Sequence, residues 1–230
     1  MAFKLYGSTS PSSTYTRLVA MIAKERNIPY EFIPVDLQKG DHKQPAYLEH
    51  HPFGQVPYIT VRHLSPFPGS HRCSALCADS YLLVEQQDDG FELFESRAIC
   101  RYLATLGSGP ELIPTDPKAR AKFEQAASME YAQFDPIGFA LFWERVIKQY
   151  NGQTTNEERV KELMAQFETK LDGYETILRK QKYLAGDVRA FHSKHVPIET
   201  VGLMNYLCRR SRSQIYSMYR SETLSLSSSN

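Results

Sequence analysis

The chain has 230 residues, a length that allows one large domain or two small ones at roughly 150 residues per domain. It is 42% hydrophobic and 23% charged, with a formal net charge of +1 at pH 7. This composition excludes disordered and collagen-like proteins, and the absence of a basic excess argues against nucleic-acid or membrane-surface binding. The longest apolar run, Ile137–Trp143, falls far short of the ~20 residues that a membrane-spanning helix needs. No signal-peptide pattern precedes it, so we expect a cytoplasmic protein.

Strand and helix signals alternate at the start of the chain. Phe3–Tyr6 predicts a short strand, and a polar stretch over residues 7–14 follows it. Leu18 and Ile22 share one face at i, i+4 spacing, which predicts an amphipathic helix ending near Asn27. Glu31–Leu37 predicts a second strand, and a right-handed crossover makes the two strands parallel.

Two further strands are predicted at Val56–Thr60 and Phe91–Phe94, and the Asp-Asp-Gly turn before the second one favours an antiparallel hairpin. A stretch rich in Ser, Cys, His and Pro, Val61–Gln86, intervenes between them. It has no sustained helical or alternating pattern, which is unusual for a connection inside a compact domain. We interpret it as an insertion.

The rest of the chain has helical patterns. Glu95–Leu106 predicts a helix, and a Gly-Ser-Gly-Pro break after it predicts a domain boundary. Pro117–Tyr150 predicts a long helix that Pro136 should kink or divide. Thr155 is predicted as the N-cap of a further helix, with Glu158 completing a capping box.

The helix that follows Thr155 carries a long apolar stripe at helical spacing. Its members are Val160, Leu163, Met164, Phe167, Leu171, Tyr174 and Leu178. After residue 187 the pattern changes: Val188–Asn230 has scattered apolar residues, a short basic run and a Ser-rich end. We therefore expect a divergent, loosely ordered tail without a clear amphipathic stripe.

Three short motifs combine residue types suited to ligand binding. Ser12 and Ser13 precede the first helix, where a hydroxyl either caps the helix or, with the helix dipole, stabilises an anion such as a thiolate. Val56-Pro57 favours a cis peptide beside a strand edge that either binds an extended peptide or blocks aggregation. Glu95 and Ser96 begin a helix, either as ordinary caps or as contacts for an amino-acid-like ligand.

These motifs, in this order, resemble the glutathione transferase family and within it the plant and fungal phi-like branch. The resemblance rests on Ser13-Thr14-Tyr15-Thr16-Arg17, His42-Lys43, His51-Pro52-Phe53-Gly54-Gln55-Val56-Pro57, Phe94-Glu95-Ser96-Arg97-Ala98-Ile99 and Tyr183-Leu184-Ala185-Gly186-Asp187. It implies an α/β thioredoxin-like N-terminal domain over residues 1–106 and an all-α C-terminal domain over residues 111–187, with the C-terminal part incomplete after that.

The resemblance also implies a role for individual residues. Ser13 matches the serine that hydrogen-bonds the glutathione sulfur and is the expected catalytic residue, with Ser12 as the alternative. The expected glutathione-binding residues are His42, Lys43, Gln55, Val56, Pro57, Glu95 and Ser96. The thiolate would attack an apolar electrophile, for which Phe139, Phe142 and Trp143 are candidate pocket walls; ordinary core packing is the alternative for these three aromatics.

The chain departs from the family pattern at several places. His51 replaces the asparagine that is usual before Pro-Phe-Gly, and Val188-Arg189-Ala190-Phe191 replaces the capping box that opens a buried central helix in the family. Both Val61–Gln86 and the tail begin with Val-Arg, and a valine codon begins with the GT dinucleotide of an intron donor. Our hypothesis is that both stretches are translated introns. Genomic and transcript sequencing reads across the two junctions would test it.

The function expected from these features is conjugation of glutathione to apolar electrophiles, with glutathione as co-substrate, no cofactor and a homodimeric assembly. The alternative is a non-catalytic glutathione-binding or interaction protein on the same scaffold. No Cys-x-x-Cys pair supports dithiol redox chemistry, and Cys100 is expected to be a core residue. Four residues of the insertion could ligate zinc, but their spacing does not form a tight zinc pattern, and we expect no metal site: His63, His71, Cys73 and Cys77.

Overall fold

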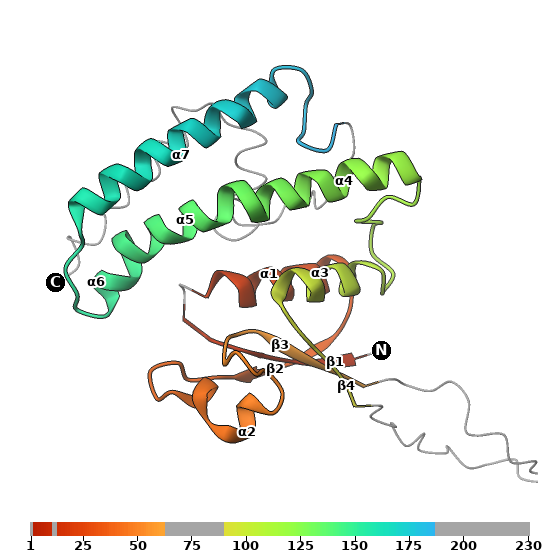
Figure 1. The fold of residues 1–230 in the computed structure, drawn as a ribbon. Coiled ribbons are helices and arrows are strands. Elements are labelled where there is room, and N and C mark those ends of the chain that lie inside the picture. The colour runs from red at the N-terminus through yellow and green to blue at the C-terminus, as the bar shows by residue number, and fades with distance from the viewer. Residues whose placement is uncertain (1, 11–12, 63–89, 187–230) are drawn as a thin grey trace, which may run out of the picture. The chain divides into compact units, whose positions relative to one another are not determined.

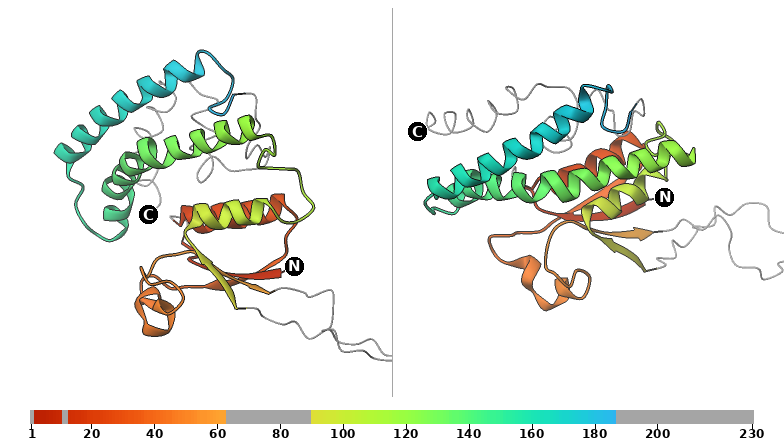
Figure 2. Two further views of the ribbon diagram at one scale, coloured as in Figure 1. Left: turned by 45° about the vertical axis from the view of Figure 1, so that its right-hand side comes forward. Right: turned by 45° about the horizontal axis from the view of Figure 1, so that its top comes forward.

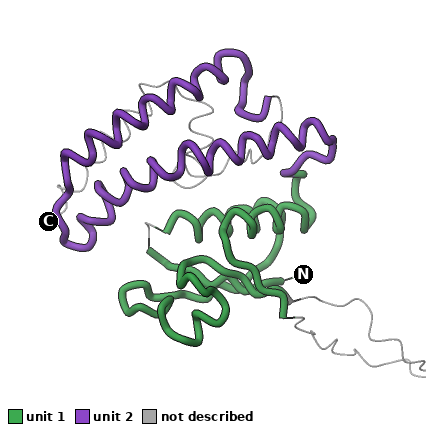
Figure 3. The backbone as a smooth tube through the Cα atoms, in the orientation of Figure 1, with its two compact units in different colours: residues 1–111 green, residues 112–230 purple. Residues whose placement is uncertain are grey.

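A computed structural model describes residues 2–10, 13–62 and 90–186 of the chain (Figure 1). The chain divides into two compact units, Met1–Glu111 and Leu112–Asn230 (Figure 3). The first unit combines a sheet with helices, and the described part of the second is helical. This architecture confirms the predicted fold class. The tail and all but the first residues of the predicted insertion lie outside the described residues, as do Ser12 and the four candidate zinc ligands.

Unit 1 contains a four-stranded mixed sheet in the order β2-β1-β3-β4. β1 (Ala2–Gly7) pairs in parallel with β2 (Tyr30–Pro34), as the β-α-β pattern predicts. β3 (Tyr58–Arg62) runs antiparallel to β1 and to β4 (Phe91–Phe94), which confirms the predicted antiparallel pair. β3 begins two residues later than predicted, after Pro57, because proline has no N–H to donate to a sheet ladder.

Helices cover both faces of this sheet. α1 (Thr14–Glu25) and α3 (Ser96–Ala104) lie side by side on one face, as Figures 1 and 2 show. The short helices η1 (Asp41–Lys43) and α2 (Pro45–Leu48) lie on the opposite face (Figure 1). α1 and α3 therefore belong to the same helical layer, on one face of the sheet.

Alternate residues of the two central strands form the core under α1 and α3. The side chains of Phe3, Leu5 and Ile59 are almost completely buried, as the two-residue period of a strand predicts. Val61 is also fully buried and pairs with both Phe3 and Phe91. The prediction that the insertion begins at Val61 is therefore wrong, because this residue continues the alternation of β3.

Unit 2 is built from a helical rod and one long helix that packs along it (Figure 1). The rod consists of α4 (Pro117–Met129), η2 (Glu130–Phe134), α5 (Asp135–Phe142), η3 (Trp143–Ile147) and α6 (Lys148–Tyr150). The long helix is α7 (Glu157–Leu178), and its predicted stripe forms the core: Val160, Leu163, Phe167, Leu171 and Tyr174 are buried, and Met164 and Leu178 are partly buried.

Pro136 neither breaks nor ends the rod. The π-helical segment η2 comes directly before it, and Pro136 stands in the first turn of α5. A proline has no N–H and its ring crowds the preceding turn, so a wider π turn accommodates it without ending the helix. Phe134 from this turn meets Phe167 of α7 with ring centroids 5.1 Å apart, edge to face.

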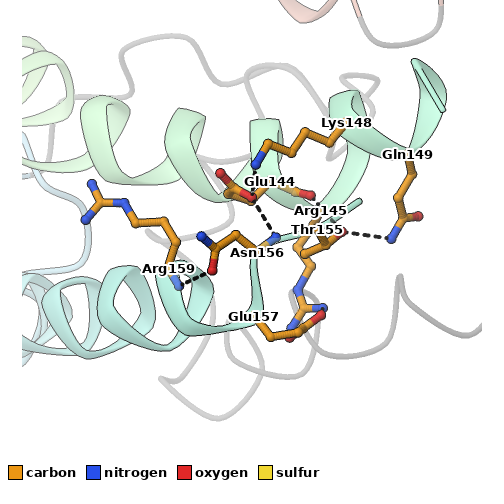
Figure 4. A network of polar contacts seen from close by, with 8 residues as sticks. All are labelled: Glu144, Arg145, Lys148, Gln149, Thr155, Asn156, Glu157 and Arg159. Carbon is orange, nitrogen blue, oxygen red and sulfur yellow. Dashed lines mark hydrogen bonds and ion pairs between the residues drawn. The ribbon is translucent and has the colours of Figure 1, made fainter. Parts of the chain in front are cut away.

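The beginning of α7 is held by a polar network (Figure 4). Asn156, and not Thr155, is the N-cap: its side-chain oxygen accepts from the backbone N–H of Arg159 at 3.0 Å. The Thr155 hydroxyl instead donates to the carbonyl oxygen of Glu144 at 3.0 Å. The Glu144 carboxylate accepts from Lys148 Nζ at 2.8 Å and from the Asn156 N–H at 3.1 Å. The predicted capping box is therefore wrong, because the Thr155 hydroxyl donates to the neighbouring helix instead of capping α7.

Candidate functional site

Ser13 stands at the N-terminal end of α1, where the chain leaves β1. Its hydroxyl makes no hydrogen bond to the helix backbone and lies 2.7 Å from the hydroxyl oxygen of Thr16. Thr16 is buried against Gly7, where an added Cβ would come within 2.3 Å of the threonine methyl carbon. Ser13 therefore begins the helix without using its side chain as a cap, and its hydroxyl is held at the positive end of the helix dipole.

The first turns of α1 and α3 lie close together. The guanidinium carbon of Arg97 is 5.6 Å from the centroid of the Tyr15 ring, so a cation–π contact joins the two turns. Ser13 precedes one of these turns and Glu95 precedes the other. Two helix N-termini thus occur next to each other, and the positive ends of their dipoles suit an anionic ligand.

Glu95 has an unusual backbone conformation. It is exposed and has φ 69°, in the left-handed region that residues other than glycine rarely occupy. Its carbonyl oxygen accepts from the backbone N–H of Ile99 at 2.9 Å, and Ser96 follows it as the buried first residue of α3. Strained backbone of this kind clusters at ligand-binding sites, and here it lies directly before a helix N-terminus.

The segment between η1 and β3 forms a compact loop that Lys43 and Tyr47 hold together. Lys43 Nζ donates to the carbonyl oxygens of Gly54 at 2.8 Å and Phe53 at 3.3 Å. The Tyr47 hydroxyl donates to the carbonyl oxygen of Gln55 at 2.6 Å. Lys43 thus fixes the loop as well as standing where the resemblance places a glutathione contact.

His42 lies beside this loop. It is half-buried, and burial lowers the pKa of its imidazole below the ordinary 6.5. Its Nδ1 atom is buried and has no hydrogen-bond partner among the described residues. Gly54 packs so closely that an added Cβ would lie 2.6 Å from the backbone oxygen of His42. The neutral imidazole is therefore next to the loop that leads to β3.

Val56 and Pro57 end the loop with a cis peptide bond, as the sequence predicts. The strand ladder begins only at Tyr58, so the backbone of Val56 stands outside the sheet pairing. Gln55 is exposed and Pro57 is buried. The predicted residues thus fall into three groups. The first is Ser13 at the N-terminus of α1, the second is the loop with Lys43 and Gln55–Pro57, and the third is the turn with Glu95 and Ser96.

An aromatic contact brings the loop and the Glu95 turn together. The rings of Phe53 and Phe94 are 6.2 Å apart and nearly perpendicular, and the His51 ring is 4.8 Å from that of Phe94. Phe94 directly precedes Glu95. Sequence reasoning missed three residues that support these groups, namely Thr16, Tyr47 and His51. Thr16 and His51 stand inside the quoted motifs, whereas nothing in the sequence singles out Tyr47.

The aromatic candidates for an electrophile pocket lie on the rod of unit 2. Phe139 and Trp143, four residues apart, are 47% and 42% exposed, and their ring centroids are 6.5 Å apart. Phe142 is half-buried. Two of the three are therefore surface residues on one helix face and not core residues, but their role in binding an electrophile stays a prediction.

Cys100 is buried inside α3, as expected of a core residue. Burial raises the pKa of its thiol to about 12. Within the described ranges, no group of three or more His, Cys, Asp or Glu side chains could hold a metal ion. Among the described helices, none is long and apolar enough to cross a membrane.

The comparisons with known proteins agree with this arrangement of elements. A family model described as the glutathione S-transferase N-terminal domain matches residues 12–106. Glutathione S-transferase PM239X14 of Arabidopsis thaliana is 44% identical over 188 residues, covering 80% of this chain and 73% of the relative. Glutathione S-transferase PARB of Nicotiana tabacum is 38% identical, covering 81% and 75%.

Solved structures show the same fold. Glutathione transferase F7 from Populus trichocarpa superimposes with a TM-score of 0.67 at 27% identity, over 96% of this chain and 93% of that one. Glutathione S-transferase I from maize, solved with an atrazine glutathione conjugate, superimposes with a TM-score of 0.65 at 26% identity, over 94% and 86%. A thioredoxin-like sheet followed by a helical unit defines the class, and the chain belongs to the glutathione S-transferase family.

Proposed function

We propose that this glutathione transferase binds glutathione across the three groups of unit 1 and transfers its thiolate to an apolar electrophile, with Ser13 as the residue that donates to sulfur. The observation that carries the proposal is the adjacency of two helix N-termini, one with the Ser13 hydroxyl, which does not cap the helix, and the other with the strained Glu95. The non-catalytic alternative is not favoured, because the relatives are named glutathione S-transferases and the match covers about three quarters of their length.

The thiol chemistry explains what Ser13 would do. A free thiol has a pKa of ~8.5 and is mostly protonated at pH 7, whereas the thiolate is the nucleophile. A hydroxyl that donates to sulfur stabilises the ionised form, and so does the positive end of α1. Because Thr16 can donate to the oxygen of Ser13, the proton of Ser13 stays available for the thiolate.

The remaining residues would hold the ends of the tripeptide. Glu95 would take the ammonium group of the γ-glutamyl unit, and Ser96 with the first turn of α3 would take its carboxylate. The backbone of Val56, outside the sheet ladder, is free to pair with the cysteinyl unit. At the other end, His42, Lys43 and Gln55 would contact the glycyl carboxylate. No cofactor takes part in this scheme.

The electrophile would be apolar. Phe139 and Trp143 offer adjacent exposed rings, and the maize relative was solved with an atrazine glutathione conjugate, which supports this class of substrate. A homodimer in the cytoplasm is the assembly that we propose. Light scattering of the purified chain would measure its assembly against the 26.4 kDa of one subunit.

The test compares wild type with Ser13→Ala and Thr16→Val in the conjugation of 1-chloro-2,4-dinitrobenzene across a pH series. Loss of one hydrogen bond to a charged group is worth about 1.5–3 kcal/mol, so Ser13→Ala should raise the apparent pKa of bound glutathione by about one to two units. Turnover at pH 6.5 should fall about tenfold or more, while the KM for glutathione changes little.

Thr16→Val should move the pH profile in the same direction by a smaller amount, because Ser13 keeps its hydroxyl but loses the donor behind it. Weaker glutathione binding with an unshifted pH profile would make Ser13 a helix residue without a catalytic role. Retention on glutathione resin without turnover of the electrophile would favour the non-catalytic alternative.

A further inference from the structure

His51 is a buried titratable residue that the proposed function does not use. It is 2% exposed, and the main chain fixes its place in the loop. Its N–H donates to the carbonyl oxygen of Tyr47 at 3.0 Å, and its own carbonyl oxygen accepts from Gly54 N–H at 2.8 Å. Main-chain hydrogen bonds on both sides therefore hold the backbone of His51 in place.

The imidazole lies among aromatic rings and has an unused polar atom. Its centroid is 4.8 Å from that of Phe94, 6.2 Å from Phe53 and 6.4 Å from Tyr47. Its Nδ1 atom is buried and has no hydrogen-bond partner among the described residues. Apolar contacts alone would be satisfied by phenylalanine, so a buried polar atom at this point needs another explanation.

The charged groups around His51 come from two other segments. Burial lowers the pKa of the imidazole below 6.5, while Glu95, at the turn after β4, and to a lesser extent the backbone of His51 itself counteract this by favouring the protonated form. Lys43, in η1, slightly disfavours it, and Tyr47, in α2, is kept neutral because burial raises the pKa of its phenol. Among the charged groups that act on His51, the carboxylate of Glu95 is thus the one that favours the protonated imidazole.

We propose that His51 is a positioning residue of the glutathione site: its neutral imidazole packs the loop against Phe94 and Glu95, and its protonation draws the Glu95 carboxylate away from the ligand. The proposal rests on the proposed function, in which Glu95 binds the ammonium group of glutathione. Glutathione binding then weakens in mild acid in a way that depends on His51.

The physical argument is competition for one carboxylate. The backbone of Glu95 is strained, and the contact of Phe94 with the imidazole lies directly before it, so the position of Glu95 responds to this packing. A protonated imidazole is a second cation beside a carboxylate that has one ammonium group to bind. The ligand and the proton therefore bind in opposition, by the reciprocity that governs linked sites.

The experiment measures binding of S-methylglutathione to the full chain by calorimetry at pH 7.5 and pH 5.5. The methyl group blocks the thiol, so the ionisation of sulfur and the role of Ser13 do not enter. In wild type the Kd should rise about threefold to fivefold at the lower pH, the range of a charge pair at a partly exposed site. In His51→Asn and His51→Phe, which have no titratable side chain at position 51, this rise should disappear.

Each outcome decides between packing and positioning. An equal pH dependence in wild type and both variants, or none in wild type, overturns the proposal. Thermal unfolding checks that the variants fold, and Phe is included because it preserves the packing against Phe94. Should neither variant fold, Glu95→Gln carries the test, since removal of the carboxylate removes the same pH component.

Glu95→Gln also separates this inference from the proposed function. If S-methylglutathione binds this variant as tightly as wild type, then Glu95 does not hold the ammonium group and the proposed function fails at this contact. If the variant binds weakly but the His51 variants keep the wild-type pH dependence, only the inference about His51 fails.

Discussion

Replacement of Gly54 by alanine should damage glutathione binding through the shape of the backbone alone. Gly54 has φ +55°, and an alanine Cβ would lie 2.6 Å from the backbone oxygen of His42. It would also lie 3.0 Å from side-chain carbons of Leu48 and Lys43. Side chains can move aside, but a main-chain oxygen in η1 cannot do so without moving the segment that carries His42 and Lys43.

The expected magnitude has two parts. The left-handed conformation costs an alanine about 1–2 kcal/mol, and forcing an extra carbon into a packed site costs about 1–3 kcal/mol. The contact is about 0.8 Å shorter than ordinary van der Waals contact, so η1 and the loop must separate by a comparable distance. A displacement of this size in a ligand site is expected to lower kcat/KM for glutathione about tenfold or more.

Gly152→Ala is the matched control, because Gly152 has φ +69° and no atom within 4 Å of the added Cβ. It should lose about 1–2 kcal/mol of unfolding free energy from backbone strain and keep wild-type kinetics. Thermal unfolding and glutathione saturation curves of the two variants provide the comparison. Equal losses of stability and equal KM values in the two variants would refute the steric argument.

Two further predictions concern groups whose pKa is shifted. Cys100, with a thiol pKa of about 12, should resist iodoacetamide at pH 8 in the folded chain and react after unfolding, and peptide mapping would detect early alkylation if the burial argument were wrong. In Glu144, the hydrogen bond from Lys148 is the main cause that lowers the pKa from 4.5. The ionised group therefore stabilises the fold fully above pH 4.5, and this stabilisation is lost as the pH falls further. The Tm advantage of wild type over Glu144→Gln should accordingly be constant near pH 7 and shrink below pH 4.5, whereas a constant difference at all pH values would contradict the assignment.

Local patterns account for much of the fold. The short apolar run Phe3–Tyr6 predicts a strand, and the turn before Phe91 predicts the antiparallel pair. The stripe that includes Phe167 and Leu171 predicts the buried face of α7. These features are predictable because the periods of strands and helices are short, so a few neighbouring residues are enough to specify them.

The sequence also placed the candidate ligand residues at the ends of elements, although their roles come from the resemblance and stay predictions. Ser13 and Glu95 each precede a helix, because the strand pattern has ended and the helical pattern begins after them. The pattern could not predict that the two helix starts meet, since the contact of Arg97 with Tyr15 joins segments far apart in the chain.

Tertiary structure alone decided the rest. Asn156 and not Thr155 caps α7, because Glu144 from the neighbouring helix takes up the threonine hydroxyl. Similarly, the sequence shows that His51 replaces an asparagine before Pro-Phe-Gly, but only the fold buries it, next to the rings of Phe53 and Phe94. Burial and hydrogen-bond choice depend on partners that the fold brings from elsewhere, and a local sequence pattern contains no information on which partner will compete best.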